Sequence, residues 1–124
     1  TPESLPKSVV IVDDSGAVRL LLKGILQEAG LTVVDMAVNG EEGVAAAFKH
    51  RPAVLCLDVE MPRMSGLEAL PLIRQVSPET KVVMVTGHPS KGFVDEAIQG
   101  GAKGYLLKPV RPALVEAFMK KLLA

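Results

Sequence analysis

Five polar residues stand where short apolar runs of the sequence stop, and their side chains suit one kind of chemistry. They are Asp13, Asp14, Asp58, Thr86 and Lys108. Three carboxylates in one crevice repel one another unless a cation lies among them, and oxygen ligands without His or Cys at metal-binding spacing suit Mg²⁺ or Mn²⁺. A metal, a carboxylate, a hydroxyl and an ammonium group together favour phosphoryl transfer, provided that the fold brings them to one place.

In such chemistry each of these side chains has a role. Asp58 would be the nucleophile and would form an aspartyl phosphate. The Thr86 hydroxyl would donate a hydrogen bond to a phosphoryl oxygen, and the Lys108 ammonium would help the metal to neutralise its charge. Each residue also has a plain structural interpretation: Thr86 as a turn residue, Lys108 as a surface charge, and Asp13 and Asp14 as helix caps. We prefer the chemical interpretation because all five residues fall at strand ends.

The elements that must position these residues alternate along the chain. Short apolar runs indicate strands buried on both faces, and between them apolar residues recur at helical spacing. Strict alternation predicts an α/β domain with one parallel sheet and helices on both of its faces. Strands are expected at 8–12, 31–37, 54–58, 81–86 and 104–107, with helices over about 16–29, 40–49, 66–76, 91–99 and 112–122.

Five strands of this kind favour the doubly wound order 2-1-3-4-5 of flavodoxin-like folds. In that order the strands that end at Asp13-Asp14 and at Asp58 are neighbours at the switch point, where open α/β sheets bind ligands. Helical spacing places Leu21, Ile98 and Leu114 among the residues that face the core. Pro71 falls inside the third helix and should bend it or delay its start.

Composition excludes several classes of partner. Fourteen basic residues balance fourteen acidic ones, so no charge excess suggests nucleic-acid binding or a membrane surface. No apolar run approaches the length of a membrane span, and residues 1–7 form a polar N-terminal extension without a visible signal peptide. The single cysteine, Cys56, is expected to be a buried hydrophobe, which suits a cytoplasmic domain over residues 8–124.

The chain resembles the receiver domain of two-component response regulators, and the run from Asp13 to Arg19 is most similar to chemotaxis-type receivers. The resemblance covers Ser8 to about Leu123. Its motifs are Val12-Asp13-Asp14-Ser15, Leu57-Asp58-Val59-Glu60-Met61-Pro62-Arg63-Met64-Ser65-Gly66, Val85-Thr86-Gly87 and Leu107-Lys108-Pro109.

The resemblance implies a signalling switch that catalyses only its own phosphorylation and dephosphorylation. Asp58 would accept the phosphoryl group from a phosphohistidine of a sensor histidine kinase or a phosphotransfer protein. Asp14 and Asp58 would bind Mg²⁺ together with the backbone carbonyl of Glu60, and Asp13 would act through a water molecule. Lys108-Pro109 would carry a cis peptide bond.

The resemblance also implies how the signal is passed on. Thr86 and Tyr105 would form a switch pair that changes the surface over residues 90–118, where a downstream output domain or target protein would read it. Glu60 and His88 occupy positions that modulate dephosphorylation in relatives.

Two other functions compete with this one. A phosphohydrolase of the haloacid-dehalogenase type also uses a strand-end Asp, an acid two residues later, a Thr and a Lys, but its second acidic pair follows the Lys. Here Glu116 is the only acid after Lys108, and the pair Asp13-Asp14 comes first. A pseudo-receiver that works by protein contact alone is disfavoured because all five site residues are intact.

Overall fold

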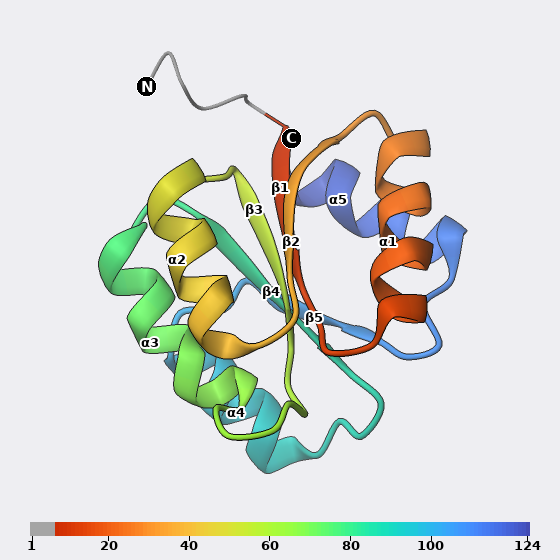
Figure 1. Ribbon diagram of the computed structural model, residues 1–124. Helices are drawn as coiled ribbons and strands as arrows, with labels where there is room; N and C mark the ends of the chain where they lie inside the picture. The colour runs from red at the N-terminus through yellow and green to blue at the C-terminus, as the bar shows by residue number, and fades with distance from the viewer. Residues whose placement is uncertain (1–6) are drawn as a thin grey trace.

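A central sheet lies between two layers of helices in the computed structural model of the protein, shown in Figure 1. The structure describes residues 7–124, so all but Lys7 of the predicted N-terminal extension lies outside the described residues. Strands and helices alternate as predicted: β1 Ser8–Val12, α1 Gly16–Glu28, β2 Thr32–Ala37, α2 Gly40–His50, β3 Val54–Asp58, α3 Gly66–Val76, β4 Lys81–Thr86, α4 Lys91–Gln99, β5 Gly104–Leu107 and α5 Pro112–Leu122.

The five strands are all parallel and lie in the order β2-β1-β3-β4-β5. The predicted fold class and strand order are therefore confirmed. The register pairs Val12 of β1 with Leu57 of β3, so these two strands stop side by side. The sheet thus gathers the residues that follow its strands at a single edge, which is the lower end of the sheet in Figure 1.

Two hydrophobic cores lie on the two faces of the sheet, because successive strand residues point in opposite directions. Helices α2, α3 and α4 cover one face, and α1 and α5 cover the other (Figure 1). Fully buried strand residues alternate between the two cores. Val10, Leu55, Leu57, Val82 and Met84 belong to the first core, and Val9, Ile11, Val54, Cys56 and Val83 belong to the second.

The only cysteine, Cys56, lies in the middle of β3 and has no exposed surface, as predicted. Burial raises the pKa of its thiol to about 12. The thiol therefore stays neutral at physiological pH and packs as a small hydrophobe.

Four of the five helices begin at a side-chain cap. The hydroxyls of Ser15, Ser65 and Ser90 and the amide oxygen of Asn39 each accept a hydrogen bond from the backbone N–H three residues later. Helix α5 instead begins with Pro112 in its first turn. The longest described helix, α1, has 13 residues, and no described helix is long and apolar enough to cross a membrane.

Of the two alternatives predicted for Pro71, a bend or a late start, the structure excludes the late start of α3. The helix begins at Gly66, five residues before the proline. Ser65 and Glu68 form a reciprocal capping box, in which each side chain accepts the other residue's backbone N–H. This cap fixes the start of α3 despite the hydrogen bond that Pro71 cannot donate.

Three helix residues that were predicted to face the core are exposed instead. The exposed fractions are 47% for Leu21, 48% for Ile98 and 62% for Leu114. Each helix buries a stripe narrower than its apolar face, since it rests on the sheet along one line of contact. The buried residues of the three helices are Leu22, Ile25 and Leu26 in α1, Ala97 in α4, and Val115 and Met119 in α5.

Candidate active site

The five residues singled out by chemistry all lie at the carboxyl edge of the sheet. Asp13 and Asp14 follow β1, Asp58 and Thr86 are the last residues of β3 and β4, and Lys108 follows β5. The parallel register sets this arrangement, because neighbouring strands stop level with one another.

The Lys108 ammonium bridges two buried carboxylates. Its Nζ lies 3.0 Å from Oδ1 of Asp58 and 3.2 Å from Oδ2 of Asp13. Asp13 and Asp58 are each 1% exposed. The lysine side chain therefore reaches from the end of β5 to the ends of β3 and β1, and it neutralises part of the charge that is buried there.

Asp14 completes an acidic cluster on the solvent side of this bridge. Asp14 is exposed, and carboxylate oxygens of Asp13, Asp14 and Asp58 lie within 4.8 Å of one another. Oxygens this close can share one cation. The cluster thus has one face in the protein and one face toward water.

The electrostatics of Asp58 are unusual for a carboxylate at neutral pH. Burial, together with the charge of Asp13, raises the pKa of Asp58 from 3.8 to about 6, although the hydrogen bonds from Lys108 and from the backbone N–H of Glu60 oppose this change. Burial alone would lower the pKa of Lys108, but the hydrogen bond and charge of Asp58, aided by Asp13, raise it above its ordinary value. Lys108 is therefore protonated at neutral pH, and it lies beside Asp58, whose raised pKa makes ionisation less favourable than in an ordinary aspartate.

Two buried carboxylate oxygens in this cluster lack hydrogen-bond partners and could bind a metal ion. Within the described residues, Oδ2 of Asp58 and Oδ2 of Asp13 are buried and have no hydrogen-bond partner, although Oδ2 of Asp13 still lies at ion-pair distance from Lys108. Buried carboxylate oxygens normally have partners. Unpartnered oxygens in an all-oxygen donor set suit a hard divalent cation such as Mg²⁺.

Backbone contacts that the sequence did not reveal hold the loop after Asp58. The Gly66 N–H donates to the carbonyl of Val59 at 2.9 Å. A Cβ at Gly66 would lie within 2.3 Å of the Asp58 backbone oxygen, so only glycine fits here without a shift. Gly66 belongs to the motif that follows Asp58 in the sequence, but a contact of this kind depends on the path of the loop in space and leaves no signal in residue spacing.

The structure also places the other residues that the resemblance singled out. Thr86 is buried, and its Oγ1 accepts a hydrogen bond from the His88 backbone N–H at 3.0 Å. The exposed side chains of His88 and Glu60 approach to 4.0 Å between Nε2 and Oε2. The Lys108-Pro109 peptide bond is cis, as the resemblance implied.

Tyr105 lies on β5 with 38% of its surface exposed. The register pairs Tyr105 with Met84 and Leu107 with Thr86, so Tyr105 stands on the same face of the sheet as Thr86 and two residues back from its level. The two proposed members of the switch pair thus share one face and adjacent strands.

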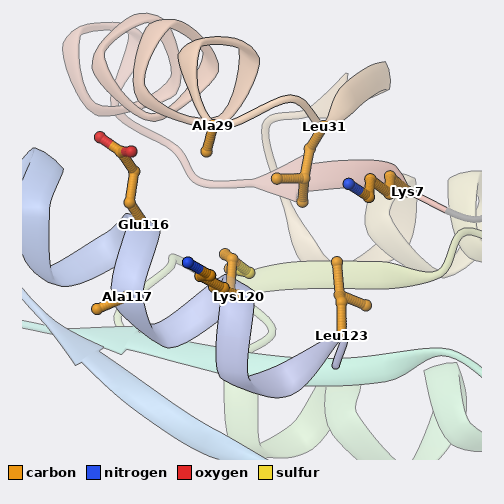
Figure 2. Close-up of a pocket in the computed structure, with 8 residues that line it drawn as sticks. Lys7, Ala29, Leu31, Glu116, Ala117, Lys120 and Leu123 are labelled. Atoms are coloured by element: carbon orange, nitrogen blue, oxygen red, sulfur yellow. The ribbon is translucent and has the colours of Figure 1, made fainter.

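A separate hollow of about 350 Å³ lies at the opposite end of the sheet, between α5 and the segments before β1 and β2. Figure 2 shows the labelled residues around it: Lys7, Ala29, Leu31, Glu116, Ala117, Lys120 and Leu123. None of the predicted site residues lines this hollow. The candidate active site is therefore the carboxylate cluster and not this hollow.

Comparisons with known proteins agree with this geometry. Residues 9–120 match the model of the response regulator receiver domain. The chain is 36% identical over 115 residues to the chemotaxis protein CheY of Thermotoga maritima, which covers 92% of this chain and 96% of that protein. It is 45% identical over 103 residues to a protein-glutamate methylesterase/protein-glutamine glutaminase of Archaeoglobus fulgidus, covering 82% of this chain but only 29% of that enzyme.

A solved structure shows the same likeness in three dimensions. The crystal structure of a CheX-CheY-BeF₃-Mg²⁺ complex from Borrelia burgdorferi superposes with a TM-score of 0.90 at 28% identity, covering 94% of this chain and 89% of that one. The fold and the sequence thus point to the same family.

Proposed function

The chain belongs to the response regulator receiver domain family, and from this we propose that it is a phosphorylation-dependent signalling switch with Asp58 as the phosphoryl acceptor. The observation that carries the proposal is the buried Asp58 carboxylate, which Lys108 contacts through one oxygen while the other oxygen has no partner among the described residues. The family match also favours this function over the phosphohydrolase alternative.

In the proposed reaction, a carboxylate oxygen of Asp58 attacks the phosphorus of a phosphohistidine on a sensor histidine kinase or phosphotransfer protein. The P–N bond of the donor breaks as the P–O bond to Asp58 forms, and the leaving imidazole nitrogen takes up a proton. Lys108, already 3.0 Å from Asp58, pairs with the incoming negative charge, and Thr86 donates its hydroxyl hydrogen to a phosphoryl oxygen.

The acidic cluster is proposed to hold Mg²⁺, with Mn²⁺ as an alternative. Asp14 and Asp58 would bind it directly together with the Glu60 carbonyl, and Asp13 would act through water. Bound Mg²⁺ would neutralise negative charge on the phosphoryl group. Two buried oxygens support this assignment: Oδ2 of Asp58, which has no hydrogen-bond partner among the described residues, and Oδ2 of Asp13, which has only the ion pair with Lys108.

We further propose that the signal leaves through the surface formed by α4, β5 and α5. Thr86 would move toward the phosphoryl group, and Tyr105 would turn inward into the space behind it. Tyr105 and Leu107 are exposed at one side of a groove of about 540 Å³, and Leu114 of α5 lines it as well. Such a groove suits a downstream target protein or output domain in the cytoplasm.

The acceptor is tested by replacing Asp58 with Asn and incubating the protein with acetyl phosphate and Mg²⁺. Labelling, measured as intact mass, should be abolished, because the amide is not a nucleophile. Asp95→Asn is the matched control, since Asp95 is an exposed residue of α4 and should leave labelling unchanged. Full labelling of Asp58→Asn would contradict the proposal.

The output surface is tested by backbone NMR on addition of beryllofluoride, a phosphoryl mimic, with Mg²⁺. Chemical-shift changes should extend from the carboxyl edge to residues 90–118. Thr86→Ala should keep the changes near Asp58 and reduce those on the distant surface. Changes confined to the carboxyl edge in the wild-type protein would exclude this route.

A further inference from the structure

We propose that Arg19 is a positioning residue that fixes the Asp13–Asp14 peptide and thereby aims the Asp14 carboxylate at the cation. Arg19 lies in the first part of α1, and its Nη1 donates a hydrogen bond of 2.7 Å to the backbone carbonyl of Asp13. The inference rests on the proposed function, because it concerns how the proposed metal ligands are held.

The peptide that Arg19 contacts joins the two acidic residues. Because a peptide unit is planar, holding the Asp13 oxygen also fixes the plane from which the Asp14 side chain departs. Asp13 is further held by its own N–H, which donates to the Ala37 carbonyl at 3.0 Å, and by its Oδ1, which accepts from the Ser15 N–H at 2.8 Å. The position of Asp13 is therefore determined from three sides.

Asp14 has no comparable support of its own. It is exposed, and among the described residues no hydrogen bond or ion pair holds its carboxylate. The direction of this carboxylate therefore depends on the backbone on either side of it. Arg19 holds the peptide before Asp14, and the hydrogen bond from the Ser15 N–H to Asp13 holds the peptide after it. Loss of the Arg19 contact would let the peptide turn, and Asp14 would visit the cation site for a smaller fraction of the time.

The Arg19 charge is directed at a carbonyl dipole rather than at an acid. Although three carboxylates lie nearby, no ion pair within 4.0 Å joins Arg19 to any described carboxylate. Arg19 therefore leaves the acidic oxygens free for a ligand. As a bare positive charge it would repel a cation, whereas as a positioning residue it would help the cation to bind, so the two roles predict opposite effects of its removal.

The test measures the Mg²⁺ dissociation constant by calorimetric titration without any phosphodonor. Arg19→Met should weaken Mg²⁺ binding by about ten- to hundredfold, the usual loss when a residue that orients a metal ligand is removed. Lys23→Met removes the same charge one turn further along α1, where no described hydrogen bond or ion pair is lost, and should leave binding unchanged or slightly tighter. Arg19→Lys should recover part of the affinity.

A second readout does not depend on the metal. In the Mg²⁺-free protein, the Asp13 carbonyl carbon and the Asp14 amide nitrogen should shift in NMR spectra of Arg19→Met but not of Lys23→Met. Equal or tighter Mg²⁺ binding by folded Arg19→Met would overturn the inference. If that variant does not fold, Arg19→Gln, which is polar but too short to keep the contact, is judged by the same criteria.

The outcomes also separate this inference from the proposed function. If the wild-type protein binds no Mg²⁺ and Asp58 is not labelled, the proposed function fails and the inference fails with it. If the wild-type protein binds Mg²⁺ and Asp58 is labelled, but Arg19→Met behaves like Lys23→Met, only the role of Arg19 is wrong.

Discussion

At the amino end of the sheet, the buried polar side chains Ser8, Ser77 and Thr80 are neutral and hydrogen-bonded. The Thr80 hydroxyl donates to the Pro52 carbonyl and also contacts the Ser77 hydroxyl, while the Ser8 hydroxyl accepts from the Ala53 N–H. Each of these groups has a partner within the protein. This end of the sheet is complete without any ligand.

The carboxyl end buries Asp13, Asp58 and Thr86, and two of these three side chains carry charge. Oxygens of both aspartates lack hydrogen-bond partners among the described residues. An unpartnered buried polar group costs about 1–3 kcal/mol, and more if it is charged. Buried hydroxyls with hydrogen-bond partners thus lie at the end of the sheet that supports the fold. Buried charges with oxygens that lack such partners lie at the end that is proposed to bind a ligand.

The largest effect expected from this difference is on phosphorylation. Lys108→Met removes the only described cation in contact with Asp58, so the rate of labelling by acetyl phosphate should fall by about 10²–10³-fold, as for other losses of a group that stabilises developing charge. Lys103→Met is the matched control, because Lys103 is exposed and lies just before β5. If Lys108→Met were labelled at the wild-type rate, the proposed electrostatic difference between the two ends of the sheet would be contradicted.

A change at the amino end should affect stability and leave phosphorylation intact. Thr80→Val keeps the shape of the side chain but removes the donor to the Pro52 carbonyl, so the free energy of unfolding should fall by about 1–3 kcal/mol in urea titrations. Thr32→Val, at an exposed residue of β2, serves as the control. If Thr80→Val slowed labelling of Asp58 without unfolding the protein, the two ends would not be functionally separate.

Much of the carboxyl end could be predicted from the sequence. Parallel strands stop at one edge, so Asp58, Thr86 and Lys108 had to approach one another once the strands were recognised. The switch-point order then placed Asp13 and Asp14 beside Asp58. Apolar runs and polar strand ends are local patterns, and local patterns are visible in a sequence.

What could not be predicted depends on the path of the chain in space. Helical spacing identifies an apolar face but not how much of it the sheet covers, so Leu21 and Leu114 were wrongly placed in the core. The close approach of Gly66 to Asp58 and the contact of Arg19 with the Asp13 carbonyl involve backbone atoms, which every residue has. No residue type in the sequence therefore indicates these backbone contacts.

The smallest expected effect concerns the pH dependence of stability without metal. The pKa of Asp58 is about 6 in the folded protein and near 3.8 when the chain is unfolded. Between these two values the folded state binds more protons than the unfolded state, so the free energy of unfolding should fall as pH rises from about 4 to about 6 and then level off. This is opposite to the usual aspartate, whose pKa is lowered by folding.

The contribution of Asp58 is isolated by comparing wild type with Asp58→Asn in urea titrations with EDTA at several pH values. The difference between the two proteins cancels the titration of the other acids. Asp58→Asn should be more stable than wild type above pH 6 by about 1 kcal/mol; a shift of one pKa unit corresponds to about 1.4 kcal/mol, but the coupled Asp13 and Lys108 reduce the effect. Thr80→Val, by contrast, should lower stability equally at every pH, because no charge is involved.

Saturating Mg²⁺ should remove the fall in the free energy of unfolding between pH 4 and 6, since the cation competes with the proton for the same oxygens. If wild type instead gained stability over this pH range relative to Asp58→Asn, the Asp58 carboxylate would be well satisfied within the protein, and the carboxyl end would differ from the amino end in charge alone.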